Sequence, residues 1–322
     1  MTYIEALSAG LRAEMLRDQG VFILGEDVGT YGGAFRVTKG FLDEFGPTRI
    51  VDTPISESAI IGAAIGSAYM GMRPVAEMQF IDFMGCAFDI ITNYAAKSRY
   101  RWGQAVPMVI RGPAGGGVNA GPFHSQNPEA SYLNVPGLKI VSPATPTDAK
   151  GLIKAAIRDD DPVIYLEHKF LYRRIKEDVP DGDFVVPIGK AAVARAGTDL
   201  SVITYGAMRH VAVDAAEILA REHAISVEVL DLRTLLPLDR EAICETVRKT
   251  SKVIILHEAT RTGGPAGEIT AIINEEVFEH LDAPVRRIAP PDTPVPYAPS
   301  LEAFFLPKVD DVVKLARELH AW

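Results

Sequence analysis

The fold is decided by the stretch Asp52-Thr53-Pro54-Ile55-Ser56-Glu57, which leads from a short strand into a helix. Pro54 disfavours helical backbone at Thr53, so the helix is expected to begin after this proline. Ser56 is a good N-cap residue, because its hydroxyl can accept a bond from a free amide of the first turn. The stretch therefore predicts Glu57 in the first turn of a helix.

The segments on either side make Glu57 a candidate ligand-binding group. Residues 49–51 have the character of the end of a strand, and residues 58–70 form a run rich in Gly and Ala that predicts a tightly packed helix. Ligands of open α/β sheets bind beyond the carboxyl ends of strands, where Glu57 is expected to lie. An acid in a first turn can equally do no more than complement the helix dipole, and the stretch alone leaves both interpretations open.

Length and charge limit the class of protein. The chain has 322 residues, of which 48% are hydrophobic, enough for two domains with full cores. Its net charge of −9 argues against binding to nucleic acid or an anionic membrane, which need clustered Lys and Arg. The first five residues lack the features of a signal peptide, and no apolar run reaches the roughly 18 residues that span a membrane. We expect a cytoplasmic protein.

Strand-like and helix-like segments alternate through the first half of the chain. This alternation predicts an α/β domain built on a parallel sheet that is covered on both faces. A capping box at Thr2 and Glu5 begins the first helix. The further expected helices are 41–45, 58–70, 84–101 and 148–157, and the strands are 21–24, 49–51, 74–78, 108–111, 138–141 and 163–166.

A second α/β series follows a polar segment. We predict a first domain over 1–175, a linker over 176–190 and a second parallel-sheet domain over 191–322. The expected strands of the second domain are 200–203, 227–230, 253–256 and 285–288, and its helices are 211–222, 240–250, 267–278 and 310–320. Five prolines between 290 and 299 predict an extended surface path before the last helix.

The longest irregular segment, residues 112–126, is a candidate active-site loop. Its Gly115–Ala120 part formally fits a dinucleotide-binding pattern but does not open a helix after a strand, so we reject that function. His124 beside Ser125 suits a general acid or a phosphate contact, or else is a solvated surface histidine. The pair at 257–258 is not a zinc-protease motif, because Arg261 stands where the second His is required, and a structural or interface role is expected.

Several ordered motifs together resemble the E1 β subunit of 2-oxo acid dehydrogenase complexes, which are thiamine diphosphate enzymes of the transketolase-like superfamily. The resemblance covers nearly the whole chain and implies a pyrimidine-binding α/β domain followed by a transketolase C-terminal-like α/β domain. The motifs are Asp52–Glu57, Arg73-Pro74-Val75-Ala76-Glu77, His124-Ser125-Gln126, Asp148-Ala149-Lys150-Gly151-Leu152 and Asp231-Leu232-Arg233-Thr234.

The resemblance implies roles for five residues. The glutamate matching Glu57 hydrogen-bonds N1′ of the cofactor's aminopyrimidine and promotes the imino tautomer, whose 4′ nitrogen removes the thiazolium C2 proton. Phe83 matches the aromatic residue that stacks on the pyrimidine. Gln79 matches a polar neighbour of the pocket, and Ile55 matches an apolar residue that lines the cofactor. His124 resembles the histidine that assists reductive acylation of the lipoyl group or binds the 2-oxo acid carboxylate.

A missing motif implies a partner. Thiamine enzymes that bind the diphosphate themselves carry Gly-Asp-Gly, which is absent here, since Phe184 follows Gly182-Asp183. The resemblance therefore implies that the diphosphate and Mg²⁺ are bound by a separate α subunit in an α2β2 heterotetramer. We expect activity only with that subunit, and acyl transfer to the E2 component.

The resemblance also implies a structural potassium ion. In related chains carbonyl and side-chain oxygens hold this ion. This chain has Asp161 where the family usually has Asn, and Asp still offers oxygen ligands. A plain acidic helix end is the alternative interpretation of this segment. The matching positions are Met108, Ala156, Ile157, Asp159 and Asp161.

The expected activity is oxidative decarboxylation of a 2-oxo acid with acyl transfer to a lipoyl group. Residues 123–130 and 167–173 resemble branched-chain members most, whereas residues 80–85 also resemble acetoin dehydrogenase β subunits, and pyruvate is a further alternative. Two other classes stay open, which are the C-terminal half of a split transketolase and a non-catalytic scaffold subunit.

Overall fold

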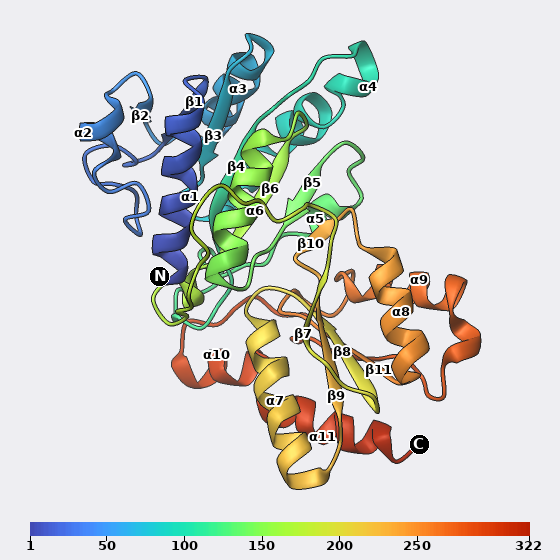
Figure 1. The fold of residues 1–322 in the computed structure, drawn as a ribbon. Helices are drawn as coiled ribbons and strands as arrows, with labels where there is room; N and C mark the ends of the chain where they lie inside the picture. The colour runs from blue at the N-terminus through green and yellow to red at the C-terminus, as the bar shows by residue number, and fades with distance from the viewer. The chain divides into compact units, whose positions relative to one another are not determined.

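The computed structural model describes residues 1–322, which form two compact units, and Figure 1 traces the chain through both. The first unit contains residues 1–114 and 131–188, and the second contains residues 115–130 and 189–322. The loop 115–130 is thus part of the second unit, although its place in the sequence lies within the predicted first domain.

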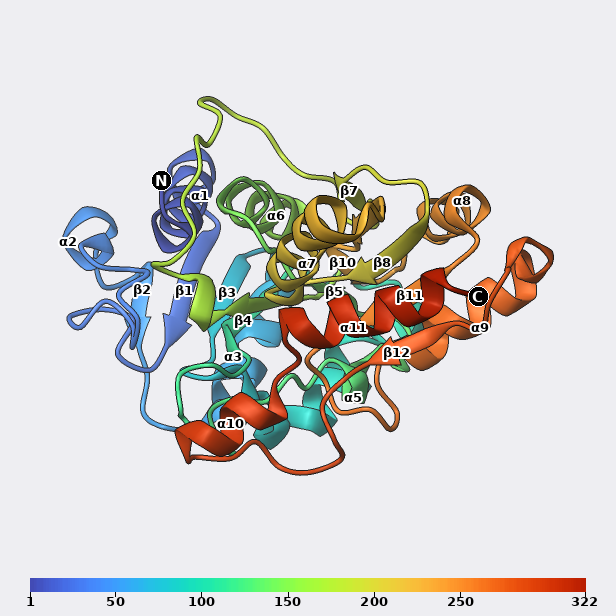
Figure 2. The same ribbon diagram turned by 90° about the horizontal axis from the view of Figure 1, so that it is seen from below.

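The first unit is built on a parallel sheet with the strand order β5-β6-β4-β3-β1-β2. Helices α1 and α6 lie on one face of these strands, and α3 lies on the other (Figure 2). This arrangement confirms the α/β class that the alternation of segments predicted. The strands are β1 Val21–Gly25, β2 Ile50–Asp52, β3 Arg73–Glu77, β4 Val109–Ala114, β5 Lys139–Val141 and β6 Val163–His168.

Local signals fix the ends of the two helices on the first face. Helix α1 (Tyr3–Arg17) begins with the predicted capping box, in which Thr2 and Glu5 bond each other's backbone amides. Helix α6 (Pro146–Arg158) has Thr145 as its N-cap and a proline at its first position. The two helices pack so closely that a Cβ atom on Gly10 would lie 2.5 Å from Cγ2 of Ile153.

The predicted helix over 84–101 is confirmed as helical backbone over most of its length, but it is not one regular α-helix. The segment forms a 3-10 helix (Ile81–Ala87), a π-helix (Ile90–Ala95) and the short helix α4 (Ser98–Trp102). Side-chain hydroxyls compete for the helical carbonyl groups, since Ser58 Oγ donates to Cys86 O at 2.6 Å and Thr92 Oγ1 donates to Phe88 O at 2.9 Å. Apolar spacing alone does not reveal this competition.

Helix α3 (Glu57–Tyr69) begins where the sequence predicted, but it is less enclosed than expected. Ser56 occupies the N-cap position without a side-chain capping bond. One face is buried, whereas Gly62, Ala63 and Gly66 on the other face are exposed, and no atom lies within 4 Å of a Cβ placed on Gly62. The chain itself therefore does not provide the close packing that these small residues suggested.

The second unit is built on a sheet with the order β12-β11-β8-β9-β7. Its strands are β7 Ala192–Arg195, β8 Leu200–Thr204, β9 Val227–Asp231, β11 Val253–Leu256 and β12 Arg286–Ile288, and Thr234–Leu236 forms the short strand β10. Edge strand β7, which the sequence did not predict, runs antiparallel to β9, so this sheet is mixed and not purely parallel. The other pairs in the sheet are parallel.

The helices of the second unit largely follow the predicted positions. They are α7 Met208–His223, α8 Arg240–Thr250, α9 Ala266–Glu276 and α11 Val309–His320. The proline-rich path, however, ends in an unpredicted helix α10 (Pro299–Phe305), because Pro299 stands at a first helical position that tolerates proline. The remaining short elements are α2 Phe41–Phe45, α5 Ala130–Leu133, and 3-10 helices at Lys169–Leu171 and Phe278–His280.

Membrane spanning was not expected from the apolar runs of the sequence. In the structure, none of the helices combines the length and the apolar character that crossing a membrane requires.

Candidate active site

Three neighbouring strands of the first unit bring the predicted pyrimidine-binding residues to one edge. Strand β1 lies between β2 and β3, and all three are parallel, so their carboxyl ends meet. Glu57 begins α3 shortly after β2, and Gln79 follows the end of β3. Phe83 lies one turn farther, in the 3-10 helix.

Glu57 is half-buried and lies close to a second carboxyl group. Glu26, which directly follows β1, is buried, and that burial raises its pKa. The negative charges of Glu57 and Asp27 raise the pKa of Glu26 further. The two carboxyl groups of Glu26 and Glu57 therefore lie close enough at this edge for their charges to interact.

Polar contacts shape the glycine-rich loop beside these carboxyl groups. Asp52 accepts a 2.6 Å hydrogen bond from the amide of Gly29, and a Cβ atom on Gly29 would lie at the same distance from the Asp52 carboxylate. The close approach requires glycine at this position. Gln79 Nε2 donates a long 3.5 Å bond to Asp27, so Gln79 lies beside the same loop.

An aromatic group and an apolar side chain complete this edge. The Phe83 ring packs edge-on against Phe80, with 5.9 Å between ring centroids. The bond from Ser58 to the carbonyl of Cys86 ties the start of α3 to the 3-10 helix that carries Phe83. Ile55 is 82% exposed, so its side chain is available to an apolar partner or ligand.

The chemistry of these groups fits an aminopyrimidine. A carboxyl and an amide can bind the ring's nitrogen atoms, and an aromatic ring can cover its face. The buried hydroxyl of Thr53, which has no hydrogen-bond partner, adds a polar atom near the start of α3.

A buried ion cluster, which the sequence did not reveal, joins three strands of the same sheet. Arg111 on β4 pairs with Glu77 at the end of β3 and with Glu167 on β6, and all three side chains are buried. Tyr172 donates a 2.6 Å bond to Glu167. Burial raises the pKa of Glu77 and the charge of Arg111 opposes that rise, so the cluster holds its carboxylates in place.

His124 belongs to the second unit and lies in the loop 115–130. Its side chain is half-buried, and its backbone amide is 3.4 Å from the carbonyl oxygen of Gly121. The start of the loop is bound by two carboxylates of the second unit, Glu258 just beyond β11 and Glu302 on α10. The sequence led us to expect a structural or interface role for the acid at 258, but it did not indicate that either acid binds this loop.

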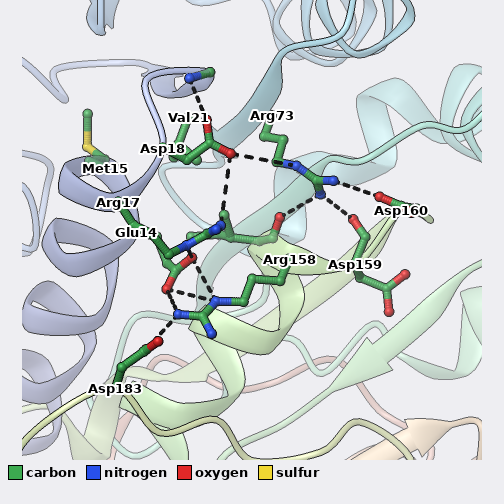
Figure 3. A network of polar contacts seen from close by, with 12 residues as sticks. Glu14, Met15, Arg17, Asp18, Val21, Arg73, Arg158, Asp159, Asp160 and Asp183 are labelled. Atoms are coloured by element: carbon green, nitrogen blue, oxygen red, sulfur yellow. Dashed lines mark hydrogen bonds and ion pairs between the residues drawn. The ribbon is translucent and has the colours of Figure 1, made fainter.

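Four of the five residues predicted to hold potassium belong to the last turn of α6 or follow it closely, and Figure 3 shows one of them, Asp159. Arg73 donates 3.0 Å bonds to the carbonyls of Ile157 and Asp159, and Lys139 binds the Asp159 carboxylate at 2.7 Å. Asp161 pairs with Arg99. The protein's own cations thus engage both carboxylates, which favours carbonyl oxygens as potassium ligands here, since each carbonyl has a second lone pair.

The other two predicted ligands are such carbonyl groups. Met108 O accepts a 3.0 Å bond from the amide of Val163, and Ala156 O accepts a 3.3 Å bond from the amide of Asp159. Each has capacity for one more partner.

Comparison with known proteins agrees with both units. Residues 1–174 match the family model of the transketolase pyrimidine-binding domain, and residues 189–312 match that of the transketolase C-terminal domain. A solved split-gene transketolase, described as an inactive β4 tetramer, superposes with a TM-score of 0.81 over 100% of this chain and 98% of its own, at 23% identity. At that identity the likeness concerns the fold alone.

Curated relatives cover nearly the full length. The 2-oxoisovalerate dehydrogenase subunit beta of Bacillus subtilis (strain 168) is 52% identical over 99% of this chain and 98% of its own. The pyruvate dehydrogenase E1 component subunit beta of the same organism is 45% identical over the same shares. A rice mitochondrial pyruvate dehydrogenase E1 subunit beta-2 is 47% identical, over 98% of this chain and 85% of its own. The chain therefore belongs to the family of E1 β subunits of 2-oxo acid dehydrogenases, within the transketolase-like fold.

Proposed function

We propose that this chain supplies the β half of the active site of a thiamine diphosphate-dependent 2-oxo acid dehydrogenase. In the overall reaction the substrate's carboxylate leaves as CO₂, and the lipoyl disulfide of E2 is reduced as one of its sulfurs takes the acyl group. The observation that carries the proposal is the meeting of Glu57, Gln79 and Phe83 at the carboxyl edge of one sheet, in a chain of this family.

Each residue has a defined part in the proposal. Glu57 would hydrogen-bond N1′ of the aminopyrimidine, and the buried Glu26 lies beside it at the same edge of the sheet. Phe83 covers the ring, and Gln79 fixes its orientation. When bound, thiamine diphosphate supplies the nucleophilic carbon that attacks the 2-oxo group. His124 binds the substrate carboxylate or assists acyl transfer to the lipoyl group.

The proposed partner is an E1 α subunit that binds the diphosphate and Mg²⁺. Support comes from the missing Gly-Asp-Gly motif and from the exposed small residues of α3. A helix face of Gly and Ala lets another backbone approach closely, and the exposed Ile55 next to it offers apolar contact. An α2β2 assembly would cover both features and exclude water from Glu57.

A branched-chain 2-oxo acid is the proposed substrate, with pyruvate and acetoin as the alternatives. The support is the higher identity to the 2-oxoisovalerate relative, 52% against 45% for the pyruvate relative from the same organism. Assays of branched-chain 2-oxo acids, of pyruvate and of the hydroxyketone acetoin, each with the lipoyl domain of E2 as acceptor, distinguish them. We also propose a structural potassium ion held by carbonyl oxygens around the end of α6.

The decisive experiment compares two first-turn acids in the chain copurified with its α subunit. Glu57→Gln is expected to lower kcat with a 2-oxo acid and an artificial electron acceptor by roughly a hundredfold or more. Asp43→Asn removes the exposed first-turn acid of α2 and is the matched control. If Glu57 only complements a helix dipole, both variants stay active and lose at most about 1 kcal/mol of stability.

A further inference from the structure

The loop that carries His124 begins with backbone amides that face two carboxylates. Gly115, Gly117 and Asn119 have positive φ values of 80°, 85° and 58°. Alternation between left-handed and other backbone conformations turns successive N–H groups toward one side, which forms a concavity for an anion. In the second unit, carboxylate side chains of the chain itself occupy this concavity.

Glu302 and Glu258 bind consecutive parts of this concavity. Glu302 accepts bonds from the amides of Gly117 at 3.0 Å and Asn119 at 2.9 Å. Glu258 accepts a 2.6 Å bond from the amide of Gly116. A Cβ atom on Gly116 would lie 3.3 Å from the Glu302 carboxylate and 3.4 Å from that of Glu258, so this glycine lies between the two.

Glu258 also closes the neck of the loop. The same oxygen that binds Gly116 accepts a 3.2 Å bond from Asn127 Nδ2. The amide of Gly115 bonds the carbonyl of Gln126 at 3.1 Å beside it. One carboxylate thus bridges both ends of the segment that contains His124, which reduces the number of conformations that the loop can adopt.

These bonds are strong because they are charge-assisted and buried. Glu258 is 6% exposed and Glu302 is 3% exposed. Glu302 makes no ion pair, so the loop amides are what stabilises its buried charge. Glu302 stands on α10 and Glu258 lies two residues beyond the end of β11, so both connect the loop to regular elements of the second unit.

We propose that Glu258 and Glu302 are positioning residues that hold the 116–127 loop so that His124 keeps a single placement. The inference rests on the proposed function for the role of His124, but the holding of the loop does not. The residues act through the loop backbone and do not contact substrate.

The first test measures amide hydrogen exchange of the full chain by mass spectrometry. Glu302→Ala is expected to speed exchange in peptides covering 115–127 by about tenfold or more, because two charge-assisted bonds are lost. Exchange in α7 should stay unchanged. In Glu302→Gln, which keeps one acceptor oxygen, the same peptides should exchange at an intermediate rate. Glu245→Ala, on the exposed side of α8, is the control.

The second test is a double-mutant cycle in the chain copurified with its α subunit. Decarboxylation and reductive acylation of the lipoyl domain are assayed separately. Glu302→Ala should slow the same half-reaction as His124→Ala, by roughly ten- to a hundredfold. The double variant should be no slower than His124→Ala alone, since both changes remove the same contribution, which is that of His124.

The outcomes separate this inference from the proposed function. Unchanged exchange in 115–127, in a Glu302→Ala chain that still folds by circular dichroism, overturns the holding of the loop. If the double variant is slowed by the product of the two single rate losses, the proposal that Glu302 positions His124 is overturned. Full activity of His124→Ala instead refutes the proposed role of His124, and the exchange measurement then still decides whether the carboxylates hold the loop.

Discussion

Tyr205 donates a 2.5 Å hydrogen bond to Glu129, at the far end of the loop that carries His124. Tyr205 directly follows β8, and its ring stacks on that of His257 beyond β11, so the bond fixes the loop end to the carboxyl edge of the second sheet. Burial raises the pKa of Glu129 from 4.5 to about 7, against the lowering effect of Tyr205, and the charge of Glu258 adds to the rise. The other oxygen of Glu129 has no partner.

This raised pKa predicts a pH-dependent stability. The folded chain binds the Glu129 proton more tightly than the unfolded chain, so the stabilisation is fully present below pH 4.5 and is lost as pH rises through about 7. The loss amounts to at most about 3 kcal/mol. Urea unfolding between about pH 5 and 8 should show that the free energy of unfolding falls as pH rises. Glu129→Gln should lack this fall, whereas Glu245→Gln, a surface control, should retain it. Equal pH slopes in wild type and Glu129→Gln would contradict this account.

The buried ion cluster of the first unit predicts a large effect from one substitution. Arg111→Met leaves the carboxylates of Glu77 and Glu167 buried without their cation, which should lower the free energy of unfolding by about 3–5 kcal/mol. The exposed pair Arg12–Glu44 is the matched control, and Arg12→Met should cost less than about 1 kcal/mol. Denaturant titration measures both. Similar losses would show that the Arg111 cluster is no more important than a surface pair.

Residues close in sequence allowed the first half of the site to be predicted. Pro54 and Ser56 located the start of α3, so Glu57 was placed correctly at the edge of the sheet from local backbone preferences alone. The segment 84–101 is helical but irregular, and the hydroxyls of Ser58 and Thr92 engage two of its carbonyls, a competition that apolar spacing does not reveal.

The two carboxylates that bind the loop 115–130 could not be predicted, for a different reason. Glu258 and Glu302 bond residues that are 142 and 185 positions away in the chain, and no local pattern encodes such a pairing. Helix α10, which carries Glu302, follows a proline-rich segment that suggested extended backbone. Gly116 and its neighbours did indicate an unusual loop, but a glycine run shows only that something approaches closely.

Two helical glycines should respond in opposite ways to the same change. Gly10→Ala places a Cβ 2.5 Å from Ile153 and should destabilise the chain by about 1–3 kcal/mol through overpacking. Gly62→Ala meets no atom within 4 Å and should stabilise the isolated chain by about 0.5–1 kcal/mol. Thermal unfolding measures both.

The exposed face of α3 also predicts an effect on assembly. Gly62→Leu should leave the isolated chain folded, since nothing in the chain contacts that position. It should prevent copurification with the α subunit if that subunit packs on the small residues. Lys314→Leu, an exposed change on α11, should leave copurification intact. A normal α2β2 complex with Gly62→Leu would remove α3 from the proposed interface.

The contacts around α6 predict a potassium effect that does not depend on carboxylates. If carbonyl oxygens hold the ion, the melting temperature should be higher in KCl than in NaCl at equal ionic strength, because an ion that binds only the folded chain stabilises it. Asp161→Asn should retain this difference, since Arg99 already engages the Asp161 carboxylate and the carbonyl remains. Arg99→Gln controls for loss of the ion pair itself. Equal melting temperatures in the two salts would argue against a potassium ion here, whereas loss of the difference in Asp161→Asn alone would assign the ion to the carboxylate.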